Sequence, residues 1–254
     1  MRCAAALVFA AASLLVPARC GAAGAEQELL VSAAASLTNA FTEAARAFER
    51  ANPGLRVVLN LAASGTLLQQ IGNGAPVDVF ASADQETMDQ AQKRGLLADG
   101  SRTNFARNLL VLAVPASSKL RIAGVQDLVR PDIKRVALGD PSFVPAGRYA
   151  RQGLVAAGLW DVLAPKRIPG NSVRQVLDYL ARGEVDAGFV FATDAAASKG
   201  RVVAVAEVGG TGPILYPIAV VAESGKKDLA RRFEEFVLSP AAGAILARHG
   251  FSRP

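Results

Sequence analysis

The stretch LLVSAAASLTNAF, residues 29–41, joins an apolar segment typical of a β-strand to a segment typical of an amphipathic helix. The helical spacing continues beyond it, in the apolar residues Leu37, Phe41, Ala44, Ala45 and Phe48. The stretch contains no charged residue, histidine or cysteine, and the first charged side chain after it is Glu43. A strand that runs directly into a helix predicts an α/β protein, and the neutral junction offers a ligand only small residues, serine and backbone.

The same order of strand and helix recurs along the chain, which predicts parallel sheets flanked by helices. In the first series, the expected strands are residues 28–35, 56–63 and 77–83, and the expected helices are 37–52, 66–74 and 84–95. In the second series, the expected strands are 108–115, 135–141 and 187–194, and the expected helices are 145–159 and 172–184. Strands at 201–208 and 214–224 and helices at 226–240 and 241–250 complete the chain.

The two series predict two α/β lobes. The first lobe is expected to hold residues 26–108 plus 219–254, and the second lobe residues 109–218. The chain would cross between them near 108–114 and 214–221. Since no Gly/Ser-rich linker lies there, these passages fit a hinge and not a flexible tether.

Residues 1–25 predict a secretory signal peptide, with Arg2 before an apolar segment, Ala4 to Val16, and the small residues AGA at 23–25 before the mature chain. The apolar segment is shorter than the roughly 20 residues that span a bilayer, which disfavours a membrane anchor. A lipid anchor at Cys20 is disfavoured as well, because Pro17 and Arg19 precede it. We therefore expect a secreted protein.

Composition excludes several classes of function. Both cysteines, Cys3 and Cys20, lie in the leader, so the mature chain has neither a disulfide nor a thiolate metal site. The leader also carries Arg2 and Arg19 and no acidic residue, so its removal lowers the formal net charge from +6 to +4. This mild charge could steer an anionic ligand. Because no basic run with interleaved aromatic residues occurs, we expect no nucleic-acid partner.

An enzyme is disfavoured by the residues that catalysis requires. The single histidine is His249, five residues from the end, where a surface or helix-end role is more common than catalysis. No G-x-S-x-G motif supports a serine hydrolase, and no metal or nucleotide motif occurs. A secreted serine hydrolase is therefore the weaker alternative to a binding protein.

Four strand–helix junctions, including this first one, are neutral in character. They are marked by Ser36, Ser64, Ala146 after Pro145, and Val173 after Ser172. The serines can be ordinary helix N-caps. Alternatively, the helix N-termini converge, and their N–H groups bind an anion without any charged side chain. In an open α/β sheet such junctions face a crevice at the carboxyl ends of the strands.

Six motifs together resemble the periplasmic molybdate-binding proteins of ABC transporters over essentially the whole mature chain. They are AAASLTNAF (33–41), NGAPVDVFASADQETMD (73–89), GDPSFVPAGRYA (139–150), WDVLAPK (160–166), DAAASKG (194–200) and YPIAVV (216–221). The resemblance implies a type II periplasmic-binding-protein fold, with two hinge crossings and the ligand in the cleft between the lobes. It also implies high-affinity capture of molybdate or tungstate, no cofactor, a monomer in the periplasm, and delivery to a membrane permease.

The ligand residues that the resemblance implies are the hydroxyls of Ser36 and Ser64 and the backbone N–H groups of Ala146 and Val173. The family's tyrosine ligand corresponds to Phe191, so one hydroxyl donor is missing. Either a water or a neighbouring hydroxyl replaces it, or the site makes one hydrogen bond fewer.

Other ligands remain open at this point. Hydroxyl and N–H donors suit an anion that carries only acceptors, and pocket size must then separate molybdate from another oxyanion such as sulfate. Arg148 and Arg174, in the first turns of two helices, could instead bind a carboxylate ligand. We expect both arginines at the rim or in solvent. A ligand-sensing domain of a regulator shares this fold, but the leader and the lack of a helix-turn-helix segment argue against it.

Overall fold

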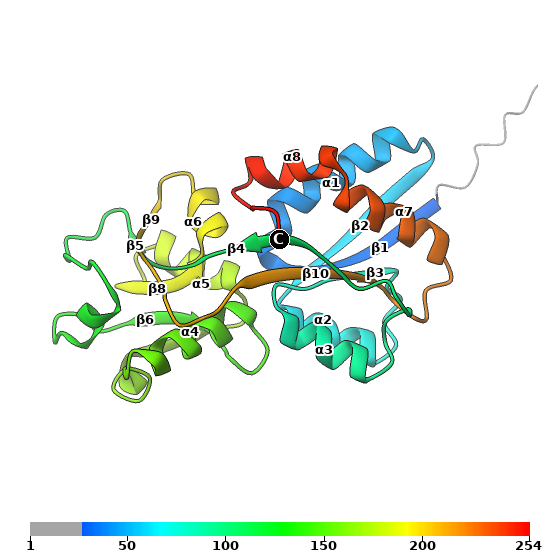
Figure 1. Ribbon diagram of the computed structural model, residues 1–254. Coiled ribbons are helices and arrows are strands. Elements are labelled where there is room, and N and C mark those ends of the chain that lie inside the picture. The colour runs from blue at the N-terminus through cyan, green and yellow to red at the C-terminus, as the bar shows by residue number, and fades with distance from the viewer. Residues whose placement is uncertain (1–26) are drawn as a thin grey trace, which may run out of the picture.

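The computed structural model describes residues 27–254, and the predicted signal peptide lies outside the described residues. Two separate five-stranded sheets, each flanked by helices, form two lobes that lie side by side (Figure 1). Within residues 27–254, no helix has both the length and the apolar character needed to cross a membrane.

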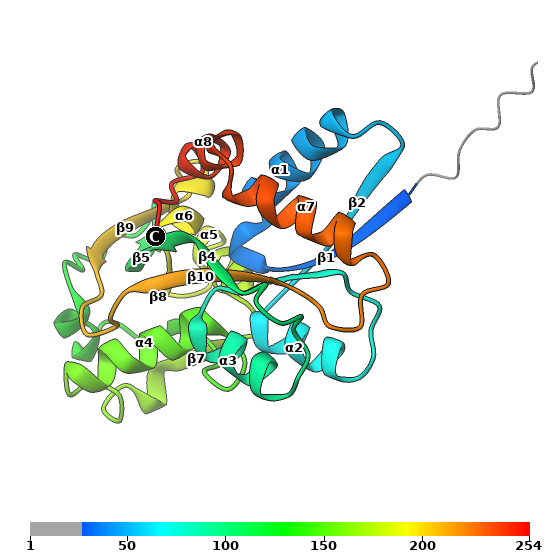
Figure 2. The same cartoon turned by 45° about the vertical axis from the view of Figure 1, so that its right-hand side comes forward.

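The first sheet has the strand order β2-β1-β3-β10-β4. Its strands are β1 (Gln27–Ala34), β2 (Leu55–Ala62), β3 (Val79–Ala81), β4 (Thr103–Asn108) and β10 (Ile214–Val220). The helices of this lobe are η1 (Ala35–Leu37), α1 (Thr38–Ala51), α2 (Ser64–Gly72), α3 (Gln85–Lys93), α7 (Lys227–Leu238) and α8 (Pro240–Arg248). Helices α1, α7 and α8 cover one face of the sheet, and α2 and α3 cover the other (Figures 1 and 2).

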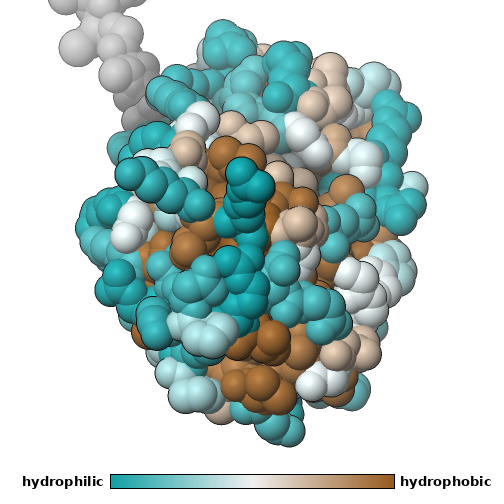
Figure 3. Space-filling view, turned by 90° about the vertical axis from the view of Figure 1, so that its left-hand side faces the viewer, coloured by the Kyte–Doolittle hydropathy of each residue, from teal (hydrophilic) through white to brown (hydrophobic). Residues whose placement is uncertain are grey.

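The second sheet has the strand order β7-β6-β8-β5-β9. Its strands are β5 (Leu110–Pro115), β6 (Val136–Gly139), β7 (Arg167–Gly170), β8 (Ala187–Phe191) and β9 (Val202–Glu207). The helices of this lobe are η2 (Val125–Val129), α4 (Pro145–Ala156), η3 (Ala164–Lys166), α5 (Val173–Ala181) and α6 (Ala192–Ala197). On the outer end of this lobe, apolar areas are divided by hydrophilic side chains (Figure 3).

The sheets are mixed, so the prediction of parallel sheets was only partly right. Strands β1, β2 and β3 are parallel, as are β6, β7 and β8, but β10 runs antiparallel to β3 and β4. Strand β5 likewise runs antiparallel to β8 and β9. Every antiparallel pair involves β5 or β10, the two strands that follow the crossings between lobes. No helix lies between β4 and β5, or between β9 and β10, to return the chain for a parallel pairing.

The crossings lie between consecutive strands of different sheets. Strand β4 ends at Asn108 in the first sheet and β5 begins at Leu110 in the second. The chain returns between β9 and β10, and β10 already pairs with β4 at Ile214. The predicted boundary at residue 219 therefore falls inside a strand of the first sheet.

Apolar side chains pack on both faces of the first sheet. On one face, the rings of Phe41 and Phe48 lie 6.2 and 5.2 Å from the ring of Phe233, which joins α1 to α7. On the other face, Phe80 and Met88 belong to a separate buried cluster beneath α2 and α3. These cores hold the strand ends, and with them the helix starts that face the second lobe.

Candidate functional site

The predicted site residues lie together around one small cavity between the lobes. Ser36 and Ser64 contribute from the first lobe, and Ala146, Val173 and Phe191 from the second. Its other lining residues are Ala34, Ala35, Ala63, Ala83, Val144 and Pro145, and none of the lining side chains is charged. Each contributing segment is the end of a strand or the start of the following helix, so the neutral junctions of the sequence do converge.

Ser36 does not cap a helix. It lies inside the 3₁₀ helix η1, whose N-terminal flanking residue is Ala34, and α1 begins after Leu37 without a side-chain cap. The Oγ of Ser36 is instead 3.0 Å from the Oη of Tyr216 on β10. The hydroxyl is thus held by a residue far away in sequence, at the edge of the cavity.

Ser64 does not cap a helix either. It is the first residue of α2, after Ala63, and its Oγ accepts a hydrogen bond of 3.0 Å from the backbone N–H of Ala83. Ser172, by contrast, is a true N-cap, since its Oγ accepts from the N–H of Gln175 at the start of α5. The N-cap interpretation therefore holds for Ser172 and fails for the two serines that line the cavity.

Two helix starts of the second lobe line the cavity. Ala146 follows Pro145 in the first turn of α4, and Val173 is the first residue of α5. First-turn N–H groups have no acceptor within their own helix and carry the positive end of the helix dipole. Two such helix starts facing one cavity attract a negative charge without an ionic side chain.

The cavity is small. Its volume is ≈ 10 Å³, whereas the neighbouring cavity, also lined by Ser36, measures ≈ 250 Å³ and includes Arg174, Arg248 and His249 in its lining. A volume of about 10–15 Å³ is the room for one water molecule. A tetrahedral anion would therefore have to widen the neutral cavity, and it would then fill it completely.

Phe191 forms an aromatic wall of the cavity. Its side chain is buried, and its ring centre lies 5.7 Å from that of Tyr216 and 6.4 Å from that of Tyr149. Burial raises the pKa of both tyrosines, so both hydroxyls are protonated at neutral pH. Phe191, at the position where the resemblance predicts a tyrosine, therefore packs against two phenol rings.

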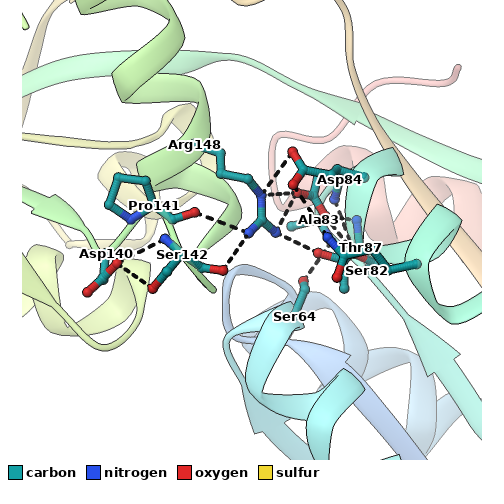
Figure 4. Close-up of polar contacts among 11 residues, drawn as sticks. Ser64, Ser82, Ala83, Asp84, Thr87, Asp140, Pro141, Ser142 and Arg148 are labelled. Atoms are coloured by element: carbon teal, nitrogen blue, oxygen red, sulfur yellow. Dashed lines mark hydrogen bonds and ion pairs between the residues drawn. The ribbon is translucent and has the colours of Figure 1, made fainter. Parts of the chain in front are cut away.

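Arg148 lies neither in solvent nor at the rim, so that prediction was wrong. Its guanidinium is buried between the lobes, with Nε 2.8 Å and Nη2 2.7 Å from Oδ2 of Asp84 (Figure 4). Nη2 also donates to Oγ1 of Thr87 at 2.6 Å, and Nη1 approaches the carbonyls of Pro141 and Ser142 at 3.3 Å. Arg148 thus ties α4 of the second lobe to the start of α3 in the first, and it does not line the neutral cavity.

Arg174 is partly exposed, in agreement with a place at the rim. Its Nε lies 2.9 Å from Oδ1 of Asp194, and one Nη is 3.4 Å from the carbonyl of Ser36. Asp194 is fully buried, and burial raises its pKa to about 6, although Arg174 acts to lower it. The Arg174 guanidinium, which a carboxylate ligand would need, is therefore already paired with the protein's own Asp194 carboxylate.

Among residues 27–254, no histidine or carboxylate is hydrogen-bonded to either serine hydroxyl. His249 pairs through Nε2 with Oε2 of Glu43 at 2.8 Å, and Arg248 pairs with the same carboxylate. In the described part of the chain, no three His, Cys, Asp or Glu side chains are grouped to hold a metal ion. The serine hydrolase alternative thus has no base for its nucleophile.

Two α/β lobes with two chain crossings and a small neutral cavity between them define a two-lobed solute-binding protein. A model of the bacterial extracellular solute-binding proteins matches residues 29–252, and the chain belongs to this family. The family binds solutes and does not catalyse reactions, as expected from the sequence.

Relatives with assigned ligands are similar over nearly the whole length. The chain is 38% identical to the molybdate-binding protein ModA of Escherichia coli (strain K12), over 96% of each chain. The periplasmic molybdate-binding protein of Azotobacter vinelandii is 28% identical, with a TM-score of 0.80 over 89% of this chain and 99% of the other. The substrate-binding domain of a putative molybdenum ABC transporter from Clostridium difficile is 34% identical, with a TM-score of 0.68 over the same shares. The predicted two-lobed fold is thereby confirmed.

Three residues that matter to the geometry were missed in the sequence. Tyr216 contacts Ser36 from 180 positions away, Asn108 contacts Tyr216, and Asp84 holds Arg148. Asp84 and Tyr216 do lie in the motifs ASADQ and YPIAVV, but their partners become visible only when the lobes are folded together.

Proposed function

We propose that the protein binds molybdate, and also tungstate, outside the cytoplasm and delivers it to the permease of an ABC transporter. The observation that carries the proposal is a neutral cavity lined by two serine hydroxyls and two helix starts. The likeness to molybdate-binding proteins, at 38% identity over 96% of the chain, supports the choice of ligand. No cofactor is required.

The proposed ligand contacts are the hydroxyls of Ser36 and Ser64 and the N–H groups of Ala146 and Val173. Molybdate is a tetrahedral dianion with four acceptor oxygens and no proton at neutral pH. Hydrogen bonds to a charged acceptor contribute about 1.5–3 kcal/mol each, so four donors suffice for tight binding in a dry cavity. Phe191 would contribute shape, not a hydrogen bond.

We propose that the two lobes close on the ligand about the two crossings, after β4 and before β10. The first lobe would then hold residues 26–108 together with the chain from the start of β10 to residue 254. The second lobe would hold the segment between these two parts. Contacts across the cleft support closure: the N–H of Gly65 donates to the carbonyl of Phe143 at 3.0 Å, and Arg148 reaches Asp84. Opening would admit the ligand and give the narrow cavity the room it needs.

The location and the partners follow from the same proposal. The family description is extracellular, and the predicted leader at 1–25 would export the chain to the periplasm. The protein would act as a monomer that presents both lobes to the permease. A sulfate receptor is the competing reading, and it differs in the size of the anion. A carboxylate receptor is less well supported, because Arg148 and Arg174 are both paired with buried aspartates.

Calorimetric titration with molybdate, tungstate, sulfate and phosphate tests the proposal. Molybdate and tungstate are expected to bind tightly, and each at 100 times its dissociation constant should add about 2.7 kcal/mol to the free energy of unfolding. In thermal unfolding, sulfate and phosphate at the same concentrations are expected to leave the melting temperature of the protein unchanged. Equal stabilisation by sulfate would overturn the choice of molybdate.

A further inference from the structure

The orientation of the Asn108 amide follows from its neighbours. The backbone N–H of Leu109 can only donate, and it lies 2.9 Å from Oδ1 of Asn108. Nδ2 therefore faces the other side, where it donates to Oγ1 of Thr193 at 2.9 Å and to Oη of Tyr216 at 3.2 Å. All of these side chains are buried at the crossing between β4 and β5.

The hydroxyl of Tyr216 then has one place for its proton. The tyrosine is fully buried, so water does not compete. Its Oη lies within hydrogen-bond distance of two side chains, Asn108 and Ser36. Since the Nδ2 of Asn108 cannot accept a proton, the Tyr216 hydroxyl must donate to the Oγ of Ser36.

We propose that Asn108 and Tyr216 are positioning residues that turn the hydroxyl proton of Ser36 toward the cavity, so that the site selects oxyanions without a proton. The inference rests on the proposed function and deepens it. Asn108 donates to Tyr216, Tyr216 donates to Ser36, and Ser36 donates to the bound anion. If Ser36 instead accepted a hydrogen bond from the anion, the hydroxyl proton of Ser36 or of Tyr216 would be buried without an acceptor, which is costly.

The other serine is arranged in the same sense by different means. The N–H of Ala83 donates to the Oγ of Ser64, so this hydroxyl also has its own proton left for the cavity. No side-chain substitution can reverse the direction of the hydrogen bond that the Ala83 N–H donates. The direction of the hydrogen bonds through Asn108 and Tyr216 can be reversed by substitution. The consequence is a site that offers donors only, which disfavours an anion that must itself donate a proton.

Selenate and arsenate are a matched pair of probes. They are close in size and carry the same charge at mildly alkaline pH, but arsenate is then the singly protonated dianion and selenate has no proton. The ratio of their dissociation constants therefore reports the acceptor or donor character of the cavity and cancels effects of charge and size. Wild-type protein is expected to prefer selenate.

Asn108→Asp reverses the chain, because a carboxylate at this position accepts from Tyr216, which then accepts from Ser36. The preference for selenate over arsenate should fall at least about tenfold in calorimetric titrations. In the Tyr216→Phe background the relay is absent, and Asn108→Asp should leave the ratio within about twofold. Asn104→Asp, which adds the same charge at an exposed position of the same strand, should not change the ratio.

Two results would overturn the inference: an unchanged ratio in Asn108→Asp, or an equal change with and without the Tyr216 hydroxyl. If Asn108→Asp does not fold, Tyr216→Phe and Tyr149→Phe decide. Loss of the Tyr216 hydroxyl should weaken molybdate binding about fivefold or more, and loss of the Tyr149 hydroxyl should have no such effect. Equal behaviour of these two variants contradicts the inference. Failure of wild-type protein to bind molybdate would instead overturn the proposed function.

Discussion

Replacement of Arg148 by methionine tests whether the ion pair across the cleft holds the closed state. The substitution keeps an unbranched apolar side chain and removes the charged guanidinium. In the closed structure it leaves Asp84, which is almost fully buried, without its cation. In an open structure water would solvate the same carboxylate, so the cost falls on closure.

The size of the effect follows from the contacts. Removal of one partner from a buried ion pair costs about 3–5 kcal/mol. Asp84 keeps the donors Ser82 Oγ at 3.1 Å and the N–H of Thr87 at 3.2 Å, which places the cost at the lower end. About 3 kcal/mol corresponds to a loss of affinity of roughly 150-fold.

Calorimetry with molybdate measures the loss, and small-angle X-ray scattering compares the shapes of the ligand-free proteins. The double variant Arg148→Met with Asp84→Asn removes the uncompensated charge and should recover most of the affinity. Arg151→Met, on the same helix but stacked on Trp160 at 5.5 Å, is the matched control and should bind as wild type does. An affinity of Arg148→Met within threefold of wild type would refute the reasoning.

Four further substitutions address the cavity itself. Ser36→Ala and Ser64→Ala should each weaken molybdate binding by roughly 10- to 100-fold in calorimetry, because each leaves an acceptor of the dianion unpaired; normal binding would remove the serine from the site. Phe191→Tyr should gain less than tenfold in affinity, because the cavity of ≈ 10 Å³ has little room for another hydroxyl, and a larger gain would show that a donor is missing. Gly65→Ala should prevent full closure, since its Cβ would lie 2.6 Å from the carbonyl oxygen of Phe143, and affinity should fall while the melting temperature of the ligand-free protein is kept.

Local patterns in the sequence were sufficient for the lobes and for the junctions that face the cleft. Apolar runs such as residues 29–34 are strands, and each junction that was marked by a small residue does begin a helix. Strand β4 was missed because its sequence, TNFARN, alternates with polar residues and lacks an apolar run. The antiparallel direction of β10 depends on which lobe the chain returns to, and no local pattern contains that information.

Partners across the cleft could not be predicted for the same reason. Arg148 was expected at the rim or in solvent because the resemblance implies no charged ligand residue, yet its partner Asp84 lies 64 positions away on the other lobe. The role of Tyr216 beside Ser36 likewise depends on the packing of β10 against the start of α1. Ala146 and Val173, which mark helix starts in the sequence, do line the cavity, and their N–H contacts to a ligand stay a prediction.

Crystals of the molybdate complex, measured at the molybdenum absorption edge, test the central claim most directly. The account predicts one anomalous peak in the neutral cavity, with the four oxygens within hydrogen-bond distance of Ser36 Oγ, Ser64 Oγ and the N–H groups of Ala146 and Val173. A peak in the neighbouring cavity beside Arg174, Arg248 and His249, or a molybdate held by any guanidinium, would contradict it.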